Sequence, residues 1–185
     1  MLTGTIRTQI DQIWNVFWSG GVSNPLSVIE QLTFLLFIKR LDELQTNEEN
    51  KVEMLGIEME RRIFPEGSDS RGEPYDNLRW SRFKNFEARE MMRIVDEHVF
   101  PFLRQLGEGG SSYGTHMKDA RLGFSSLNLL AKVVQMLDVI DMDDRDTKRD
   151  VYSVRCGKSN LDAQNVSICV SERANLYIFN LKSTY

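Results

Sequence analysis

Apolar side chains recur every three or four positions through most of residues 1–140, which is the spacing of one face of an α-helix. The first such pattern covers residues 6–18 and ends at Gly20-Gly21. Its members are Ile6, Ile10, Ile13, Trp14, Phe17 and Trp18. The pattern predicts an amphipathic helix that buries this stripe against a core.

The next pattern, residues 25–44, is apolar on nearly every side through its middle. Pro25 suits the first turn of a helix, because its fixed φ and missing N–H cost nothing there, and either Ser23 or Asn24 can cap it. The apolar positions are Val28, Ile29, Leu32, Phe34, Leu35, Leu36, Ile38, Leu41 and Leu44. Burial on all sides predicts the central helix of the domain.

Further helices are predicted along the chain. A short amphipathic stretch at 51–63 precedes a loop, residues 65–77, that is rich in proline, glycine, serine and charge. A helix is predicted over 85–106 with a kink at Pro101, and another from Ser125 or Ser126 to Ile140. Their apolar positions are Phe86, Met91, Ile94, Val95, Val99, Phe102 and Leu106 in one, and Leu127, Leu130, Val133, Val134, Leu137 and Ile140 in the other.

The helical period is lost after residue 152. Residues 141–150 form a charged connector in which Asp146 or Thr147 can cap one further short helix. Beyond it, apolar and polar residues alternate as they do in strands, at Val166, Ile168 and Val170 and again at Tyr177, Phe179 and Leu181. We therefore expect a mainly α fold, a bundle of five or six helices, with scope for a short C-terminal β-hairpin.

Composition narrows the class of protein. The 185 residues are 41% hydrophobic, enough to bury a core, and the net charge of -4 describes an acidic globular domain rather than a nucleic-acid-coating protein. Any DNA contact is therefore expected to be local. The N-terminus lacks a signal-peptide pattern and the apolar run at residues 32–38 is too short to span a bilayer, so a cytoplasmic protein without membrane contact is expected.

The sequence contains no candidate catalytic residues. Cys156 and Cys169 lack metal-ligand spacing and are expected to be free thiols, and an ordinary hydrogen-bonded histidine is favoured over a metal ligand for both His98 and His116. No glycine-rich turn follows a strand pattern, as a phosphate-binding loop would require. We predict no catalytic, cofactor-binding or metal-binding residues in the chain.

Basic residues beside aromatic ones are the only candidate binding groups. They are Lys39, Arg40, Arg79, Arg82 and Lys84. Such residues can contact DNA phosphates while a neighbouring ring anchors the segment, here Trp80 or Phe83. The alternative is structural: the rings complete the core and the arginines pair with surface carboxylates.

Four ordered segments resemble the N-terminal helical domain of type I modification methyltransferases. Residues 30–43, EQLTFLLFIKRLDE, are similar to that family's Q-x-T-x-L-L-F-x-K-R-L-D helix. Residues 78–81 (LRWS) follow, then 117–120 (MKDA) with a helix holding KVV at 132–134, then DTK at 146–148. The resemblance covers residues 1–152, although Arg149 stands where the family has a glycine.

The resemblance implies a function for the complete subunit. Such a subunit transfers a methyl group from S-adenosylmethionine to the exocyclic amine of adenine in DNA. It works with a specificity subunit, a second modification subunit and a restriction subunit. The helical domain would contribute subunit and DNA contacts.

The catalytic half of the family pattern is missing. Neither the cofactor loop nor the Asn-Pro-Pro-aromatic motif for the flipped adenine occurs, so we expect the chain alone to be inactive. Residues 153–185 do not resemble the family, and we expect this tail to come from a truncation or a frameshift. The alternative function is a stand-alone helical module for protein interaction or dimerisation.

Overall fold

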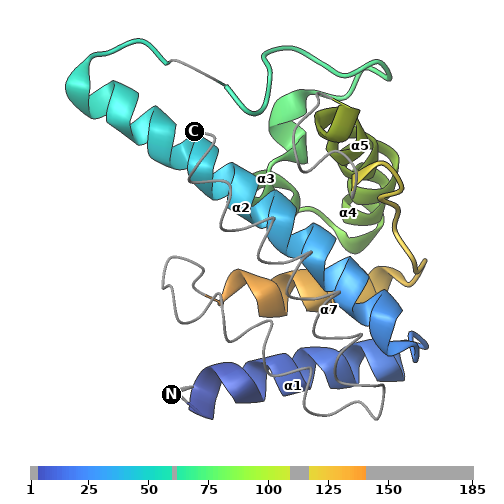
Figure 1. The fold of residues 1–185 in the computed structure, drawn as a ribbon. Coiled ribbons are helices and arrows are strands. Elements are labelled where there is room, and N and C mark those ends of the chain that lie inside the picture. Colours follow the sequence, from blue (N-terminus) through green and yellow to red (C-terminus); the bar gives the residue numbers. More distant parts are fainter. Residues whose placement is uncertain (1–3, 60–61, 109–116, 141–185) are drawn as a thin grey trace.

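A computed structural model describes residues 4–59, 62–108 and 117–140 as a bundle of helices (Figure 1). The elements in order are α1 (Gly4–Ser19), α2 (Pro25–Leu55), a 3-10 turn (Tyr75–Leu78), α3 (Trp80–Phe83), α4 (Ala88–Ile94), a π-helical turn (Val95–Val99), α5 (Phe100–Glu108) and α7 (Leu127–Asp138). Within these residues no strand forms, so the predicted mainly α fold is confirmed. The predicted hairpin, the domain end at 152 and the tail 153–185 lie outside them.

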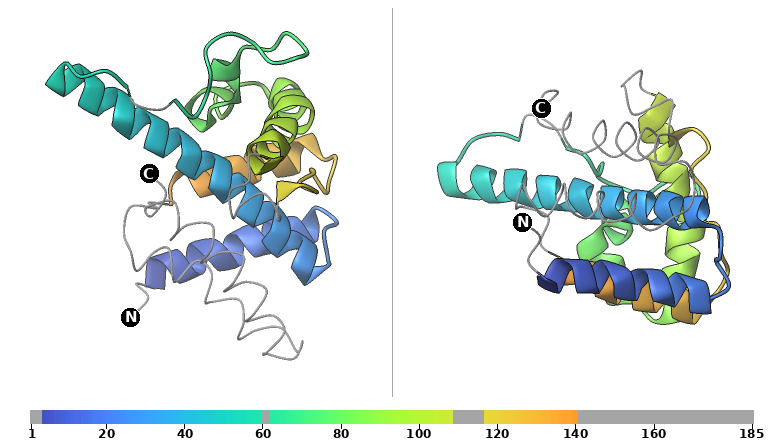
Figure 2. Two further views of the ribbon diagram at one scale, coloured as in Figure 1. Left: turned by 45° about the horizontal axis from the view of Figure 1, so that its top comes forward. Right: turned by 60° about the horizontal axis from the view of Figure 1, so that its bottom comes forward.

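The long helix α2 crosses the bundle, and α7 packs against both α1 and α4 (Figure 2). Every residue of α2 from Thr33 to Asp42 is buried, which confirms the prediction of a central helix. The core that it joins includes Phe17, Phe83, Phe100 and Leu130. None of the described helices is both long and apolar enough to cross a membrane.

The start of α2 agrees with its sequence and the end does not. Asn24 is the cap, and its Oδ1 accepts a hydrogen bond from the N–H of Leu26 at 2.9 Å, with Pro25 in the first turn. The predicted end near residue 44 is wrong, because α2 is 31 residues long, ends at Leu55 and includes the start of the stretch predicted at 51–63. Gly56, in the left-handed conformation with φ 64°, ends it.

The apolar stripe of α1 is narrower than predicted. Ile10, Ile13 and Phe17 are buried and Trp14 packs against the core, but Trp18 is 52% exposed. Successive residues of a helix are about 100° apart, so a helix that packs with one narrow face cannot bury both Phe17 and Trp18.

The helix predicted over 85–106 is interrupted. It begins at Ala88, passes through the π-helical turn and resumes as α5. Pro101 has no N–H to give to the carbonyl of Glu97, and the N–H of Phe100 bonds to Val95. The guanidinium of Arg71 donates to the Glu97 carbonyl at 3.1 Å instead. A loop residue thus supplies the hydrogen bond that the proline cannot make.

The segment before α7 is fixed to α2 by one buried amide. The side chain of Gln31, 3% exposed, donates to the carbonyl of Arg121 at 3.1 Å and accepts from the N–H of Gly123 at 3.0 Å. Ser126 then caps α7 through the N–H of Leu129, as one of the two predicted alternatives. The start of α7 is therefore set by contacts with α2 as well as by its own cap.

Candidate functional site

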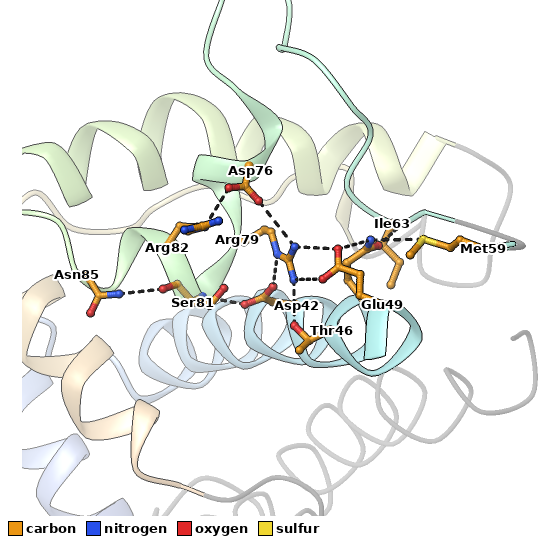
Figure 3. Close-up of polar contacts among 11 residues, drawn as sticks. Asp42, Thr46, Glu49, Met59, Ile63, Asp76, Arg79, Ser81, Arg82 and Asn85 are labelled. Carbon is orange, nitrogen blue, oxygen red and sulfur yellow. Dashed lines mark hydrogen bonds and ion pairs between the residues drawn. The ribbon is translucent and has the colours of Figure 1, made fainter. Parts of the chain in front are cut away.

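Arg79 is the centre of a polar network between α2 and the start of α3 (Figure 3). Its Nε donates to Asp42 at 2.6 Å, while Nη1 and Nη2 each donate to a carboxylate oxygen of Glu49 at 2.9 Å. Nη2 also donates to the hydroxyl of Thr46 at 2.9 Å. The three acceptors lie at i, i+4 and i+7 of α2, which places them on one face of that helix.

Asp42 holds both the side chain and the backbone of the second segment. Its other carboxylate oxygen accepts from the N–H of Ser81 at 2.7 Å, so a residue of α2 caps the first turn of α3. This carboxylate therefore joins the two segments 30–43 and 78–81 directly.

Hydrogen bonds stabilise the charged forms of Arg79 and Glu49. Burial alone would lower the pKa of the Arg79 guanidinium, but hydrogen bonds to Glu49 and Asp42 outweigh it and leave that pKa raised. Burial also opposes ionisation of Glu49, yet hydrogen bonds from Arg79 and Gln45 hold the pKa of this carboxyl below its ordinary value. The network is thus a set of ion pairs.

A pocket of about 290 Å³ adjoins this network. Its walls include Glu49, Phe64, Asp76 and Arg79, together with Arg62, which pairs with Glu66 at 3.0 Å. The charged groups of the walls are engaged with one another, and Arg79 donates to α2 rather than into the pocket. The pocket therefore offers no nucleophile or base set apart for chemistry.

Arg82 lies in the next turn with a different environment. It pairs with Asp76 at 2.9 Å, but its side chain is 60% exposed and that of Asp76 51%. Arg79, at 12%, is largely enclosed. Of the two arginines, Arg82 is the one that a phosphate in solution can reach.

Lys39, a residue of α2, is buried against the C-terminal end of α7. Its ammonium donates to three backbone carbonyls, those of Leu137 at 3.0 Å, Asp138 at 3.2 Å and Ile140 at 2.6 Å. The last carbonyls of a helix have no partner within the helix and carry the negative end of its dipole. A lysine of α2 therefore caps α7.

Asp138 binds Lys84, another of the five basic residues, and Trp80, one of the two rings predicted to anchor the segment. Its carboxylate accepts from the indole Nε1 of Trp80 at 2.9 Å and from Lys84, whose Nζ lies 3.0 Å from each oxygen. Burial opposes ionisation, but these hydrogen bonds hold the pKa of Asp138 below its ordinary value. Lys39, Trp80 and Lys84 thus converge on one helix end.

The five basic residues predicted to contact DNA are therefore not one surface. Lys39 and Lys84 meet at the end of α7, Arg79 and Arg82 meet at Asp76, and Arg40, 7% exposed, pairs with Glu43 at 3.0 Å. Their contact with DNA stays a prediction.

Pairing of the arginines with carboxylates was one of the two predicted alternatives, but the particular carboxylates were not identified from the sequence. Asp42 could have been found, because a carboxylate on a helix predicted to be buried needs a partner, whereas Thr46 and Glu49 lie beyond residue 44, where that helix was predicted to end. Asp138 carried a weaker signal, as an acidic residue in the last turn of a helix, where the dipole disfavours it.

A second network surrounds His98, which is 3% exposed. Nδ1 lies 2.6 Å from a carboxylate oxygen of Asp69, and Nε2 lies 3.0 Å from the guanidinium of Arg93. Arginine can only donate, so Nε2 accepts and the proton is on Nδ1, facing Asp69. His98 is thus hydrogen-bonded as predicted.

Metal binding has no support in the part of the chain that the structure describes, where no group of three or more His, Cys, Asp and Glu side chains could hold an ion. His116, Cys156 and Cys169 lie outside that part.

Comparison with known proteins identifies the domain. The family model described as HsdM N-terminal domain matches residues 6–137, from α1 to the last turn of α7. No curated protein and no solved structure matches the chain. The matched region contains Asp42, Arg79 and Trp80, whose contacts hold α2, α3 and α7 together. The chain belongs to the HsdM N-terminal domain family, the N-terminal domain of the modification subunit of type I restriction-modification systems.

Proposed function

We propose that the chain acts as a non-catalytic part of a DNA adenine methyltransferase, within an assembly that uses S-adenosylmethionine. The observation that carries the proposal is the family match over residues 6–137. The polar contacts of the described residues support an accessory role, because the signature residues Lys39, Asp42 and Arg79 bind other parts of the domain. Chemistry would be supplied by a catalytic domain.

The partners follow from the proposed assembly. They are a specificity subunit, a second modification subunit, a restriction subunit and DNA, all in the cytoplasm. For DNA contact the exposure of Arg82 favours it over Arg79. The predicted contact is electrostatic and independent of base sequence, since a contact with a phosphate carries no sequence information.

The test is complementation in trans. A type I modification subunit lacking its own N-terminal domain would be mixed with its specificity subunit, DNA and the full 185-residue chain. We expect the chain to restore measurable methyl transfer from labelled S-adenosylmethionine. The matched control is the Leu35→Asp variant, in which a charge replaces a side chain that is 1% exposed.

Two outcomes would count against the proposal. Cofactor binding by the isolated chain in calorimetry would show that it contains a site of its own. Failure of the folded chain to bind or activate the truncated subunit would favour the alternative, a stand-alone interaction module.

A further inference from the structure

We infer that Lys39, Trp80 and Lys84 form a clamp on the C-terminal end of α7, and that this clamp fixes the position and orientation of the helix end up to Ile140. The three are positioning residues for this helix end. The clamp itself does not depend on the proposed function.

The first element of the clamp holds the backbone. Lys39 donates to the carbonyls of Leu137, Asp138 and Ile140, and both apolar side chains there are at most 2% exposed. The Leu137 carbonyl also accepts from the N–H of Ile140 at 3.2 Å. A buried carbonyl without a partner is costly, so the lysine matters most for the carbonyls of Asp138 and Ile140. Three bonds from one ammonium also fix the path of the backbone past the last helical turn.

The second element holds the side chain of Asp138. A carboxylate at the negative end of a helix dipole is unfavourable unless something compensates for it. Trp80 and Lys84 do so, with hydrogen bonds of 2.9 and 3.0 Å. Lys39 of α2 therefore holds the backbone at the end of α7. Trp80 of α3 and Lys84, which follows α3, hold the side chain of Asp138. Attachment at two such points resists rotation of the helix end as well as its displacement.

The clamp is separable from the core of α7. Leu130, Val133 and Val134 are fully buried and anchor the middle of that helix through apolar contacts. Val139, by contrast, is 68% exposed, between the half-buried Asp138 and the buried Ile140. Loss of the clamp should release the last turn while the middle of α7 stays packed.

The first test is hydrogen exchange on the full chain with a Lys39→Met variant. Methionine keeps the length and apolar stem of the side chain but cannot donate. We expect the amides of residues 137–140 to exchange about tenfold faster or more, and those of residues 130–134 to change by less than about threefold. Lys132→Met, at an exposed position of the same helix, is the matched control and should change neither set.

Two milder variants keep the inference testable if Lys39→Met does not fold. Trp80→Phe removes the indole N–H but keeps an aromatic ring, and Lys84→Met removes the charge at a half-buried position. Both should accelerate exchange at 137–140, and Lys39→Arg should restore part of the protection. Unchanged exchange in all three donor-removing variants, or equal acceleration along the whole of α7, would overturn the clamp.

The second test measures how well the position of the helix end is fixed. Nitroxide labels at Val139→Cys and Gln12→Cys, in a chain whose Cys156 and Cys169 are replaced by serine, report the distance from the helix end to α1. We expect a narrow distribution in the otherwise unchanged chain and a broad one with Lys39→Met. Equal widths would overturn the positioning role. Because neither test involves methyl transfer, a failure here is distinct from failure of the complementation assay.

Discussion

The carboxylate of Asp42 lies 2.6 Å from the Nε of Arg79, and both side chains are largely enclosed, at 6% and 12% exposure. The pair joins the central helix to the segment that begins α3. Since Asp42 also accepts from the N–H of Ser81, removing it leaves two donors without this acceptor.

Replacing Asp42 by alanine should destabilise the domain by about 2–3 kcal/mol, because two enclosed donors lose an acceptor while Arg79 keeps its bonds to Glu49 and Thr46. Chemical denaturation with fluorescence detection measures the free energy of unfolding. Arg82→Ala is the control, because its exposed pair with Asp76 should contribute at most about 1 kcal/mol. Equal effects of the two variants would show that the Asp42 pair is not buried in solution.

Leu35→Asp should abolish cooperative unfolding, since an unpaired charge cannot be buried at a position that is 1% exposed. Circular dichroism and thermal melting would reveal it. Met54→Asp near the end of the same helix, at 84% exposure, should melt like the unchanged chain. A normal melting curve for Leu35→Asp would mean that α2 is not central.

Asp69→Ala should expose the loop before the 3-10 turn to proteases. Asp69 accepts from the N–H groups of Arg71 and Glu73, both at 2.9 Å, and contacts His98. We expect trypsin to cut after Arg71 about tenfold faster in the variant, because local opening becomes easier. Ser70→Ala, an exposed neighbour, is the control, and equal cleavage of both variants would contradict the prediction.

Acid should destabilise the domain through Asp69 and Asp138. Burial opposes ionisation of both, but hydrogen bonds, mainly from His98 to Asp69 and from Trp80 to Asp138, hold each pKa below the ordinary 3.8. A lowered folded-state pKa stabilises the fold above the unfolded-state value, and this contribution is lost as pH falls through the folded-state value.

The melting temperature should therefore fall below about pH 4, and less steeply in Asp138→Asn than in the unchanged chain. Asp119→Asn, at an exposed position, should keep the original slope. Identical slopes for all three proteins would show that Asp138 is not stabilised as a carboxylate.

Arg82→Glu should weaken DNA binding by an assembled enzyme about threefold to tenfold at low salt, because one phosphate contact is lost and a repulsion added. The domain should stay folded, since the exposed pair with Asp76 contributes little stability. Filter binding or fluorescence anisotropy would measure the affinity. Arg89→Glu makes the same charge change at another exposed residue. Equal weakening by both would indicate general electrostatics rather than a contact at Arg82.

Much of the fold could be predicted because helical periodicity and caps are local properties. Asn24, Pro25 and Ser126 mark helix starts that the structure confirms. The end of α2 could not be placed from its neighbours, since the polar turn after Leu44 is stabilised by side-chain pairs such as Gln45 with Glu49, at 2.9 Å. Helix ends depend on such weak local balances.

The roles of the basic residues were harder to predict because they depend on which segments meet. Lys39 is 98 positions from the first carbonyl it caps, and Trp80 is 58 from Asp138. A cluster of lysine, arginine and tryptophan has the same composition whether it faces DNA or another helix. Only the packing of α2, α3 and α7 decides between the two.

The unbroken burial of α2 from Thr33 to Asp42 has a consequence for how such domains are identified. A helix enclosed on every side restricts the choice of residue at each consecutive position rather than at one position in four. Selection for packing alone can then conserve a continuous run of residues. A motif of that origin reflects the fold, so it identifies related domains but carries no information about an active site.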